Sequence, residues 1–325
     1  MFLLSVPASA LSWLGRQGTR AVAAVIFIAI AVPPMGDILR PLLTASIFAL
    51  LTVAFTRVDL QQVRARLRQP RLILLAACWS MLAVPAAFGA AMLLGGVDAS
   101  SPDLFLAVML QSMASPLISA PAFAALVGLD ATLVLVTLVV TTASVPFTAA
   151  LFALIYFGPD MALAPLALGG QLALLLGGAA ITAAIIRRVA GYVRIAARRT
   201  ELDGINIILL YVFSAAIMEN VAAGFWATPL LMIGLTALSF VIFFVMFSAT
   251  ALSFWWAGRD SALSLGFMAS QRNMGLMLGA TGGALPDLTW VYFAVAQFPI
   301  YLTPQMLKPV MGMLRGVSGK PSPPR

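Results

Sequence analysis

The chain has 325 residues, of which 62% are apolar and 9% are charged, with a net charge of +8, no His and one Cys. A soluble domain carries about 25% charged residues, so this composition argues against a soluble enzyme, a nucleic-acid-binding protein or a secreted disulfide scaffold. One Cys excludes an internal disulfide, and without His a zinc or copper site of the usual ligands is not expected.

Residues 1–15 are apolar but short, and their first basic residues, Arg16 and Arg20, follow the apolar run. A signal peptide has its positive charges before that run, so we expect an interfacial helix or the start of the first span. A bilayer span needs about 20 apolar residues, and the rest of the chain divides into ten apolar segments. The predicted spans are 21–34, 38–57, 71–95, 103–127, 131–157, 163–187, 205–223, 228–257, 262–284 and 288–313.

Basic residues are distributed unevenly between the two sides of this ten-span arrangement. Seventeen of the 19 Lys and Arg residues fall on the side that holds both termini and the loops 58–70 and 188–204. The positive-inside rule therefore predicts a multi-pass protein of the inner membrane with both termini in the cytoplasm. The pI near 10.5 then reflects topology and contact with anionic lipid, and no nucleic-acid partner is needed.

The long basic loop at 187–201 divides the chain after span 5 or 6, which indicates five spans in each half. Because five is odd, a duplicated unit predicts inverted repeats, over about 21–157 and 163–313. The fourth span of each half is interrupted, by Pro116 and Pro121 in one and by the polar triplet 271–273 in the other. The sequence thus predicts an all-α membrane protein with a single transporter domain at 21–313, a cytoplasmic segment at 1–20 and a flexible tail at 314–325.

Arg272 lies near the middle of the ninth predicted span, between two mainly apolar stretches. An Arg at mid-bilayer costs about 2.5–3.5 kcal/mol on insertion scales, so it normally faces a partner or an aqueous cavity. Arg272 either marks a functional site or is paired internally for structure, with Glu219 as one candidate partner.

Three stretches of the sequence resemble the bile acid:sodium symporter family, within the wider group that holds arsenite and auxin-type carriers. They are LLTASIFALLTVAFTRVDLQQV at 42–63, SPLISAPAFAALVGLDATLVLVTLVVTTASVP at 115–146 and SQRNMGLMLGA at 270–280. The resemblance implies ten spans, broken helices 4 and 9 that cross, and a division into panel and core domains.

The sequence departs from the family at the sodium ligands. Where sodium-binding members carry a Glu and a Gln in span 9, this chain has Met268 and Arg272. The family's Ser-Asn pair in span 4 falls on Ala120 and Pro121, or one residue later, and a Gln in span 3 falls on Ser80. Sodium binding is therefore doubtful, and no other cofactor is expected. The signature Cys of the arsenite carriers is absent, and Cys78 is expected to be a buried apolar residue.

The candidate site consists of the polar or helix-breaking residues at the two interruptions. These are Ser115, Ser119, Pro121, Gln271, Arg272 and Asn273. A wider set of residues inside the predicted spans comprises Ser80, Gln111, Ser112, Thr141, Thr142, Ser144, Glu219, Met268 and Gln297. For the serines the alternative is a hydroxyl bonded to its own helix.

We expect a secondary carrier of a small organic anion that works by alternating access. In this hypothesis the guanidinium of Arg272 replaces the family's bound cation and bonds to carbonyls or hydroxyls of the span 4 break, to Asn273 or to Gln271. Any exposed part of it would favour an anionic substrate. The alternatives are a sodium symporter with a rebuilt ion site and a non-transporting sensor or scaffold. An enzyme is not expected, because no general acid–base pair is evident.

Overall fold

The computed structural model describes residues 2–32, 34–58, 70–158, 164–219 and 221–316. These residues are helical with no β-strand, and two of them form one isolated β-bridge. The first half contains α1 (Phe2–Gln17), α2 (Thr19–Ala31), α3 (Pro34–Leu39), η1 (Arg40–Leu42), α4 (Leu43–Arg57), α6 (Pro70–Cys78), η2 (Trp79–Ala83), α7 (Val84–Leu94), α8 (Val97–Ser100), α9 (Pro102–Met113), α10 (Ala120–Val127) and α11 (Ala131–Phe157).

The second half begins with the long helix α12. It contains α12 (Pro165–Ala190), α13 (Tyr192–Ala197), α14 (Arg199–Ile217), α15 (Val221–Ala227), α16 (Pro229–Ser253), η3 (Trp255–Ala257), α17 (Arg259–Ser270), α18 (Met274–Ala280), α19 (Asp287–Val295) and α20 (Gln297–Gly316). Helix α20 extends three residues into the segment 314–325 that the sequence predicts to be a flexible tail. The rest of that segment lies outside the described residues.

Five helical segments are long and apolar enough to cross a membrane. They are Pro70–Leu94, Ala131–Phe157, Pro165–Ala190, Arg199–Ala227 and Pro229–Ser253, and residues 8–17 with 20–31 make a sixth if that bent pair is one span. Each of the ten predicted segments contains helix. The four predicted spans beyond these six, 38–57, 103–127, 262–284 and 288–313, are short or interrupted in the structure, so the count of ten stays a prediction. The chain is an all-α protein with the helices of a membrane protein.

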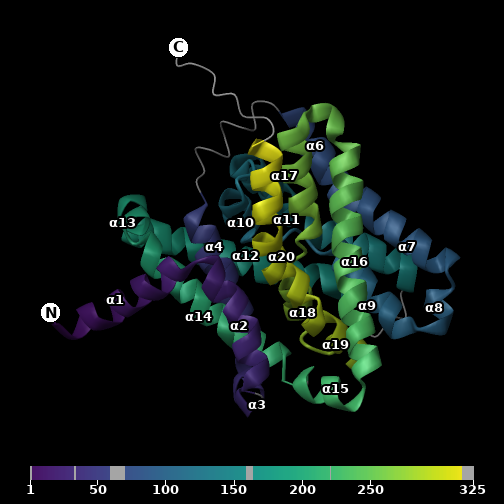
Figure 1. Ribbon diagram of the computed structural model, residues 1–325, viewed down its shortest axis with the longest axis horizontal. Helices are drawn as coiled ribbons and strands as arrows, with labels where there is room; N and C mark the ends of the chain where they lie inside the picture. The colour runs from purple at the N-terminus through teal and green to yellow at the C-terminus, as the bar shows by residue number, and fades with distance from the viewer. Residues whose placement is uncertain (1, 33, 59–69, 159–163, 220, 317–325) are drawn as a thin grey trace.

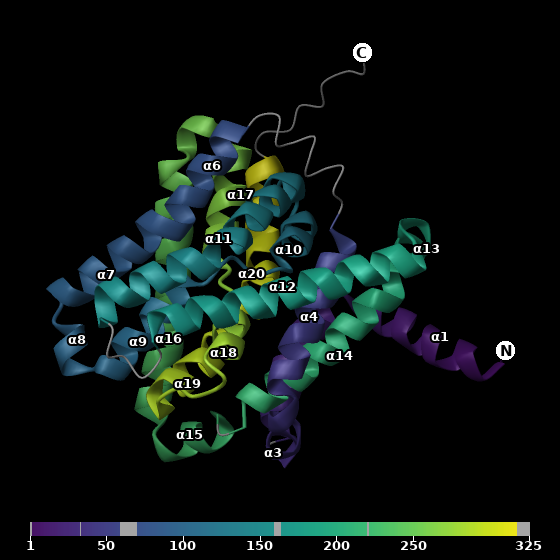
Figure 2. The same ribbon diagram turned by 180° about the vertical axis from the view of Figure 1, so that it is seen from behind.

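The helices pack in two groups. One group brings α1, α2 and α4 against α14, with α12 packed on α4. In the other group α9 packs on α7 and α19, α16 on α17, and α11 on α6 and α10. Seen from behind, α12 runs across the molecule from α13 towards α11, against which it packs (Figure 2).

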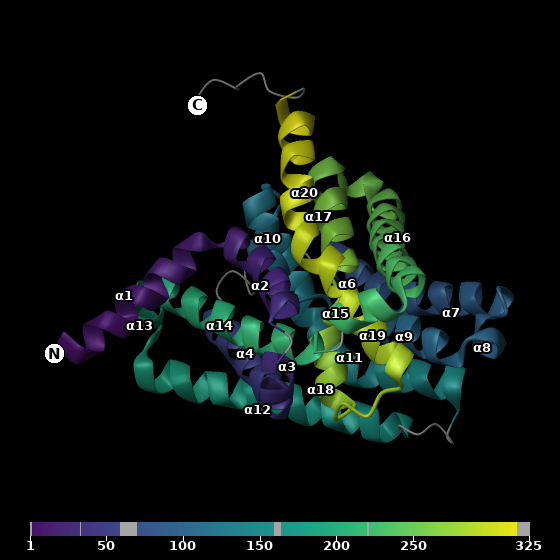
Figure 3. The same cartoon turned by 60° about the horizontal axis from the view of Figure 1, so that its bottom comes forward.

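Helix α1 belongs to the first group of helices. It meets α2 at an angle of 97° and lies along α14, at the end of the molecule away from α7 and α8 (Figure 3). A Cβ atom on Gly204 would lie 2.1 Å from the carbonyl oxygen of Leu11, and one on Gly15 would lie 2.1 Å from that of Thr200. Glycine at both positions therefore permits direct backbone contact between α1 and α14.

Candidate functional site

Two interrupted helices meet through their backbones at the centre of the second group. One interruption separates α9 from α10 and the other separates α17 from α18. Pro116 pairs with Arg272 in an antiparallel bridge. The amide of Leu117 donates to the carbonyl of Gln271 at 2.6 Å, and the amide of Asn273 donates to that of Ser115 at 2.8 Å. Backbone groups that lack helical partners thus bond to each other across the two breaks, as the sequence analysis expects.

Local sequence explains why the helices stop here. Pro116 has no amide hydrogen and disfavours helix in Ser115, so the chain leaves α9 at Ala114, whereas Pro121 lies in the first turn of α10, where a missing amide hydrogen is tolerated. After the second break, the side-chain Oδ1 of Asn273 accepts a hydrogen bond from the amide of Leu276 at 3.1 Å and caps α18.

The guanidinium of Arg272 bonds only to backbone carbonyls. Its Nη1 donates to Ala114 at 2.8 Å, and Nη1 and Nη2 both donate to the carbonyl of Ser80 at 3.3 Å. The residue is 0% exposed. Arg272 therefore ties α17 to the end of α9 and to the π-helical turn η2, with its charge wholly inside the protein.

The carbonyl of Ser80 is available because the helix around it is irregular. In a regular α-helix this oxygen would accept from Val84, but the amide of Val84 bonds to Trp79 instead. The next residue is Pro85, which has no amide hydrogen. The carbonyl of Ser80 therefore has no partner within its own helix, and it accepts hydrogen bonds from Arg272. The sequence analysis did not foresee this contact, although a proline five residues after Ser80 was a usable signal.

Among the described residues, the other polar side chains of the crossing make no hydrogen bond to Arg272. Gln271 Nε2 donates to the hydroxyl of Thr303 in α20 at 3.1 Å. The expected bonds from Arg272 to Asn273 or to Gln271 are therefore wrong, because Asn273 caps α18 and Gln271 bonds to Thr303.

Two further expectations about Arg272 are corrected. Glu219 is not its partner, because Glu219 pairs with Arg40 at 3.3 Å and Arg272 contacts only carbonyls. No part of the guanidinium is exposed. An attraction that needs an exposed guanidinium does not apply to this conformation.

The remaining candidates divide into bonded and unbonded side chains. The hydroxyls of Ser112, Thr141 and Ser144 bond to carbonyls of their own helices, which is the alternative expected for hydroxyls inside spans. Gln111 accepts a hydrogen bond from the hydroxyl of Tyr292, and Gln297 donates to the carbonyl of Phe293 at 3.0 Å. Three candidate side chains make no hydrogen bond to any of the described residues: Met268 is buried, Ser119 is half-buried at the start of α10, and Pro121 lies in the first turn of α10.

Unpartnered polar atoms concentrate on the candidate residues. Among the described residues, six buried side-chain nitrogen or oxygen atoms have no hydrogen-bond partner, and five belong to predicted site residues. They are Ser80 Oγ, Ser115 Oγ, Thr142 Oγ1, Gln271 Oε1 and Arg272 Nε. Buried polar groups are normally paired, so this concentration makes the crossing the candidate site. Within the same described residues, no group of three or more His, Cys, Asp and Glu side chains could hold a metal ion.

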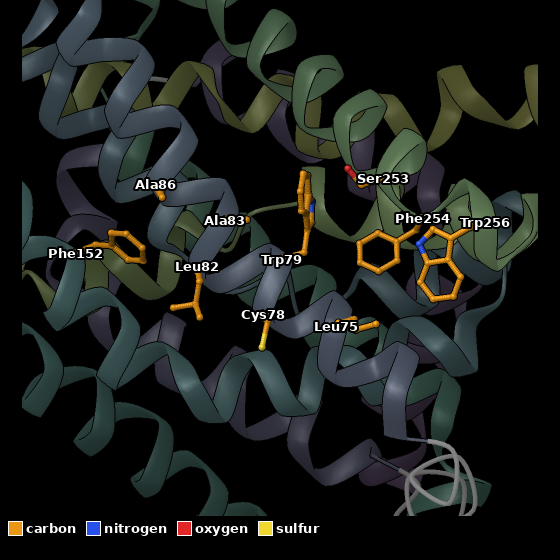
Figure 4. Close-up of a pocket in the computed structure, with 10 residues that line it drawn as sticks. All are labelled: Leu75, Cys78, Trp79, Leu82, Ala83, Ala86, Phe152, Ser253, Phe254 and Trp256. Atoms are coloured by element: carbon orange, nitrogen blue, oxygen red, sulfur yellow. The ribbon is translucent and has the colours of Figure 1, made fainter.

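A separate hollow of about 730 Å³ lies on the outer side of η2 (Figure 4). Trp79 stands at its centre, edge-on to Phe254 and bonded through Nε1 to the hydroxyl of Thr250 at 3.0 Å. Cys78 lines this hollow and is exposed, so the expectation of a buried Cys78 is wrong. The lining is almost entirely apolar and holds none of the unpartnered atoms, so the crossing is the better candidate site.

No protein-family model matches the chain, and no curated protein matches it either.

Proposed function

We propose that the chain is a secondary carrier of a small organic anion that works by alternating access. The observation that carries this proposal is the crossing of two interrupted helices, closed by backbone bonds between 115–117 and 271–273. Irregular backbone at membrane depth is tolerated only where it is buried in protein or lines a cavity, and carriers use such breaks for binding. The resemblance to the bile acid:sodium symporter family points to the same function.

Helix packing supports the proposed inverted repeat. Helix α2 begins the first half and α12 begins the second. Helix α12 packs against α4 and α11 of the first half. Helix α2 packs against the counterparts of those two helices in the second half, α14 and α20. At the crossing, α9 packs on α18 and α10 packs on α17, which is again an exchange between halves. Such paired contacts are what a twofold relation between residues 21–157 and 163–313 requires, and they favour the ten-span arrangement.

The arrangement of the ends supports an orientation. In Figure 1 the starts of α6 and α17 lie at the top with the end of α20, whereas α3, α15 and α19 lie towards the bottom. Arg71 and Arg259 lie in the first turns of α6 and α17, and Arg315 lies at the end of α20, so the proposed cytoplasmic face is the upper one, with the bilayer around the apolar helices.

In this proposal the guanidinium of Arg272 takes the place of the cation that sodium-binding members of the family hold. It draws together two carbonyls, those of Ser80 and Ala114, from two different helix interruptions. Because a guanidinium is permanently charged and sodium needs several oxygen ligands, the same place cannot favourably hold both. Transport is therefore expected to be independent of a sodium gradient, and the uncompensated positive charge favours an anionic solute over a cationic one.

Uptake by purified protein in lipid vesicles tests the proposal. The probes are ¹⁴C-labelled mono- and dicarboxylates, offered with an inward sodium gradient and with an equal potassium gradient. We expect saturable uptake of at least one probe at the same rate in both, and a loss with Arg272→Gln but not with Arg188→Gln, a change at an exposed arginine of α12. Sodium-dependent uptake would support the rebuilt symporter, and binding without uptake would support the sensor or scaffold.

A further inference from the structure

One edge of the buried guanidinium of Arg272 has no protein partner. The edge formed by Nη1 and Nη2 is shared by a single oxygen, the carbonyl of Ser80, and the outer hydrogen of Nη1 goes to Ala114. Nε has no hydrogen-bond partner, and Nη2, which has two hydrogens, makes one bond. The hydrogens left over on Nε and Nη2 lie parallel on the side of the guanidinium, and that pair is the fork that grips a carboxylate.

Among the described residues, no carboxylate pairs with Arg272. Both groups that accept from it are neutral carbonyls, and the residue is 0% exposed. The ion pairs Arg40–Glu219 and Arg57–Asp203 lie elsewhere. A buried charge without a counter-charge is costly, and a hydrogen-bonded anion relieves that cost.

A second unpartnered polar group belongs to the residue whose carbonyl Arg272 binds. The hydroxyl of Ser80 is buried and has no hydrogen-bond partner, although its own carbonyl is bonded to the guanidinium. A serine hydroxyl can donate to an anion. Two donors on Arg272 and one on Ser80 therefore remain available around one fixed positive charge.

We propose that the Nε–Nη2 edge of Arg272 and the hydroxyl of Ser80 bind one small monovalent anion. Two sources share this chemistry: a halide ion from solution, or the carboxylate group of the carried solute. Only the second source rests on the proposed carrier function. The fork geometry favours a carboxylate, because two oxygens can accept the two parallel hydrogens, whereas a halide must share them.

Thermal unfolding of the purified protein in detergent tests the proposal. The buffer contains only a bulky zwitterion, and choline chloride or choline acetate is added at increasing concentration. A bound anion raises the Tm little below its Kd and in proportion to the logarithm of its concentration above it, so the dependence of Tm on concentration gives an apparent Kd. A stronger response to acetate identifies the carboxylate source, and a response to chloride alone identifies the halide source.

Three variants separate a specific site from a general salt effect. Arg272→Gln should abolish the logarithmic rise in Tm, and Ser80→Ala should raise the apparent Kd by about tenfold, because one hydrogen bond to a charged ligand is lost. Arg188→Gln should behave as wild type. If Arg272→Gln does not fold, Ser80→Ala decides, since it keeps the carbonyl that Arg272 binds. A wild-type response no larger than that of Arg272→Gln, or an unchanged apparent Kd in Ser80→Ala, overturns the proposal. Neither result depends on uptake, so a failure here and a failure of the carrier proposal are distinguishable.

Discussion

Replacing the guanidinium of Arg272 by a sodium site is the most direct test of its proposed role as a substitute for the family's bound cation, which we call the tethered-cation hypothesis. Replacing Arg272 by Gln removes the guanidinium that the carbonyls of Ser80 and Ala114 accept from, at 3.3 and 2.8 Å. Replacing Met268 by Glu adds a carboxylate one turn earlier on α17, at a position that is 1% exposed. Together the two carbonyls, the new amide oxygen and the new carboxylate give enough oxygens for a hard cation.

The expected magnitude follows from linkage. At a sodium concentration 100 times its Kd, a site present only in the folded state adds about 2.7 kcal/mol of stability. For a chain of this size that corresponds to a Tm rise of roughly 3–5 °C. The assay is thermal unfolding in sodium chloride against potassium chloride at equal ionic strength.

The single variants are the controls. Met268→Glu alone should show no preference for sodium, because Arg272 remains to neutralise the new carboxylate. Wild-type protein should also respond equally to sodium and potassium. The tethered-cation hypothesis is wrong if wild-type protein is stabilised by sodium over potassium, or if the double variant folds and remains indifferent to the two ions.

Three further predictions concern packing, local geometry and orientation. Gly204→Ala should destabilise the protein by about 1–3 kcal/mol in thermal unfolding, because its Cβ would meet backbone at 2.1 Å, while Gly234→Ala, with nothing within 4 Å, should be neutral or slightly stabilising; equal effects would contradict the tight crossing. Pro85→Ala returns an amide donor to the π-helical turn and should weaken saturable uptake; unchanged uptake would separate that turn from function. A cysteine at Gln62, outside the described residues, should resist impermeant reagents in intact cells, and one at Ala99 should react; labelling at Gln62 would contradict the orientation.

The sequence predicts helical segments and breaks well because both are local properties. Apolar runs separated by basic loops mark each helical segment, and the pair Pro116 and Pro121 marks one interruption from missing donors alone. The boundary after α10 is also local: Gly128 has a φ of 84°, and Asp130 caps α11 by accepting from the amide of Leu133. That the two breaks meet could be expected only on the assumption of a repeat. The backbone bonds show the meeting, and the repeat stays a prediction.

The partners of individual side chains could not be predicted, because they depend on which atoms other segments leave unpaired. Arg272 bonds to Ser80 because a π-helical turn frees that carbonyl. Asn273 was expected near the guanidinium, but its own helix start takes the side chain as a cap. Cys78 was expected inside, but the direction in which its helix faces is a property of the assembled bundle, and it lies outside.

The last prediction concerns a contact between the two helix groups near the lower face. Arg40, in the first group, pairs with Glu219 at 3.3 Å and lies 5.3 Å from the ring centroid of Trp290 in α19, which belongs to the second group. Because alternating access requires the groups to move relative to each other, this contact is expected to favour the described conformation.

Removing the indole ring of Trp290 should therefore change how accessible the crossing is to labelling reagents, rather than whether the protein folds. The Arg40 side chain is 56% exposed, so the cation–π contact is worth only about 0.5–1 kcal/mol, or a two- to fivefold change in population. We expect Trp290→Leu to speed labelling of an Asn273→Cys reporter by that factor, in a background where Cys78 is replaced by Ala. Trp226→Leu is the matched control, because Trp226 is 89% exposed on neighbouring α15. Equal labelling rates in the two tryptophan variants would show that the contact does not couple the groups.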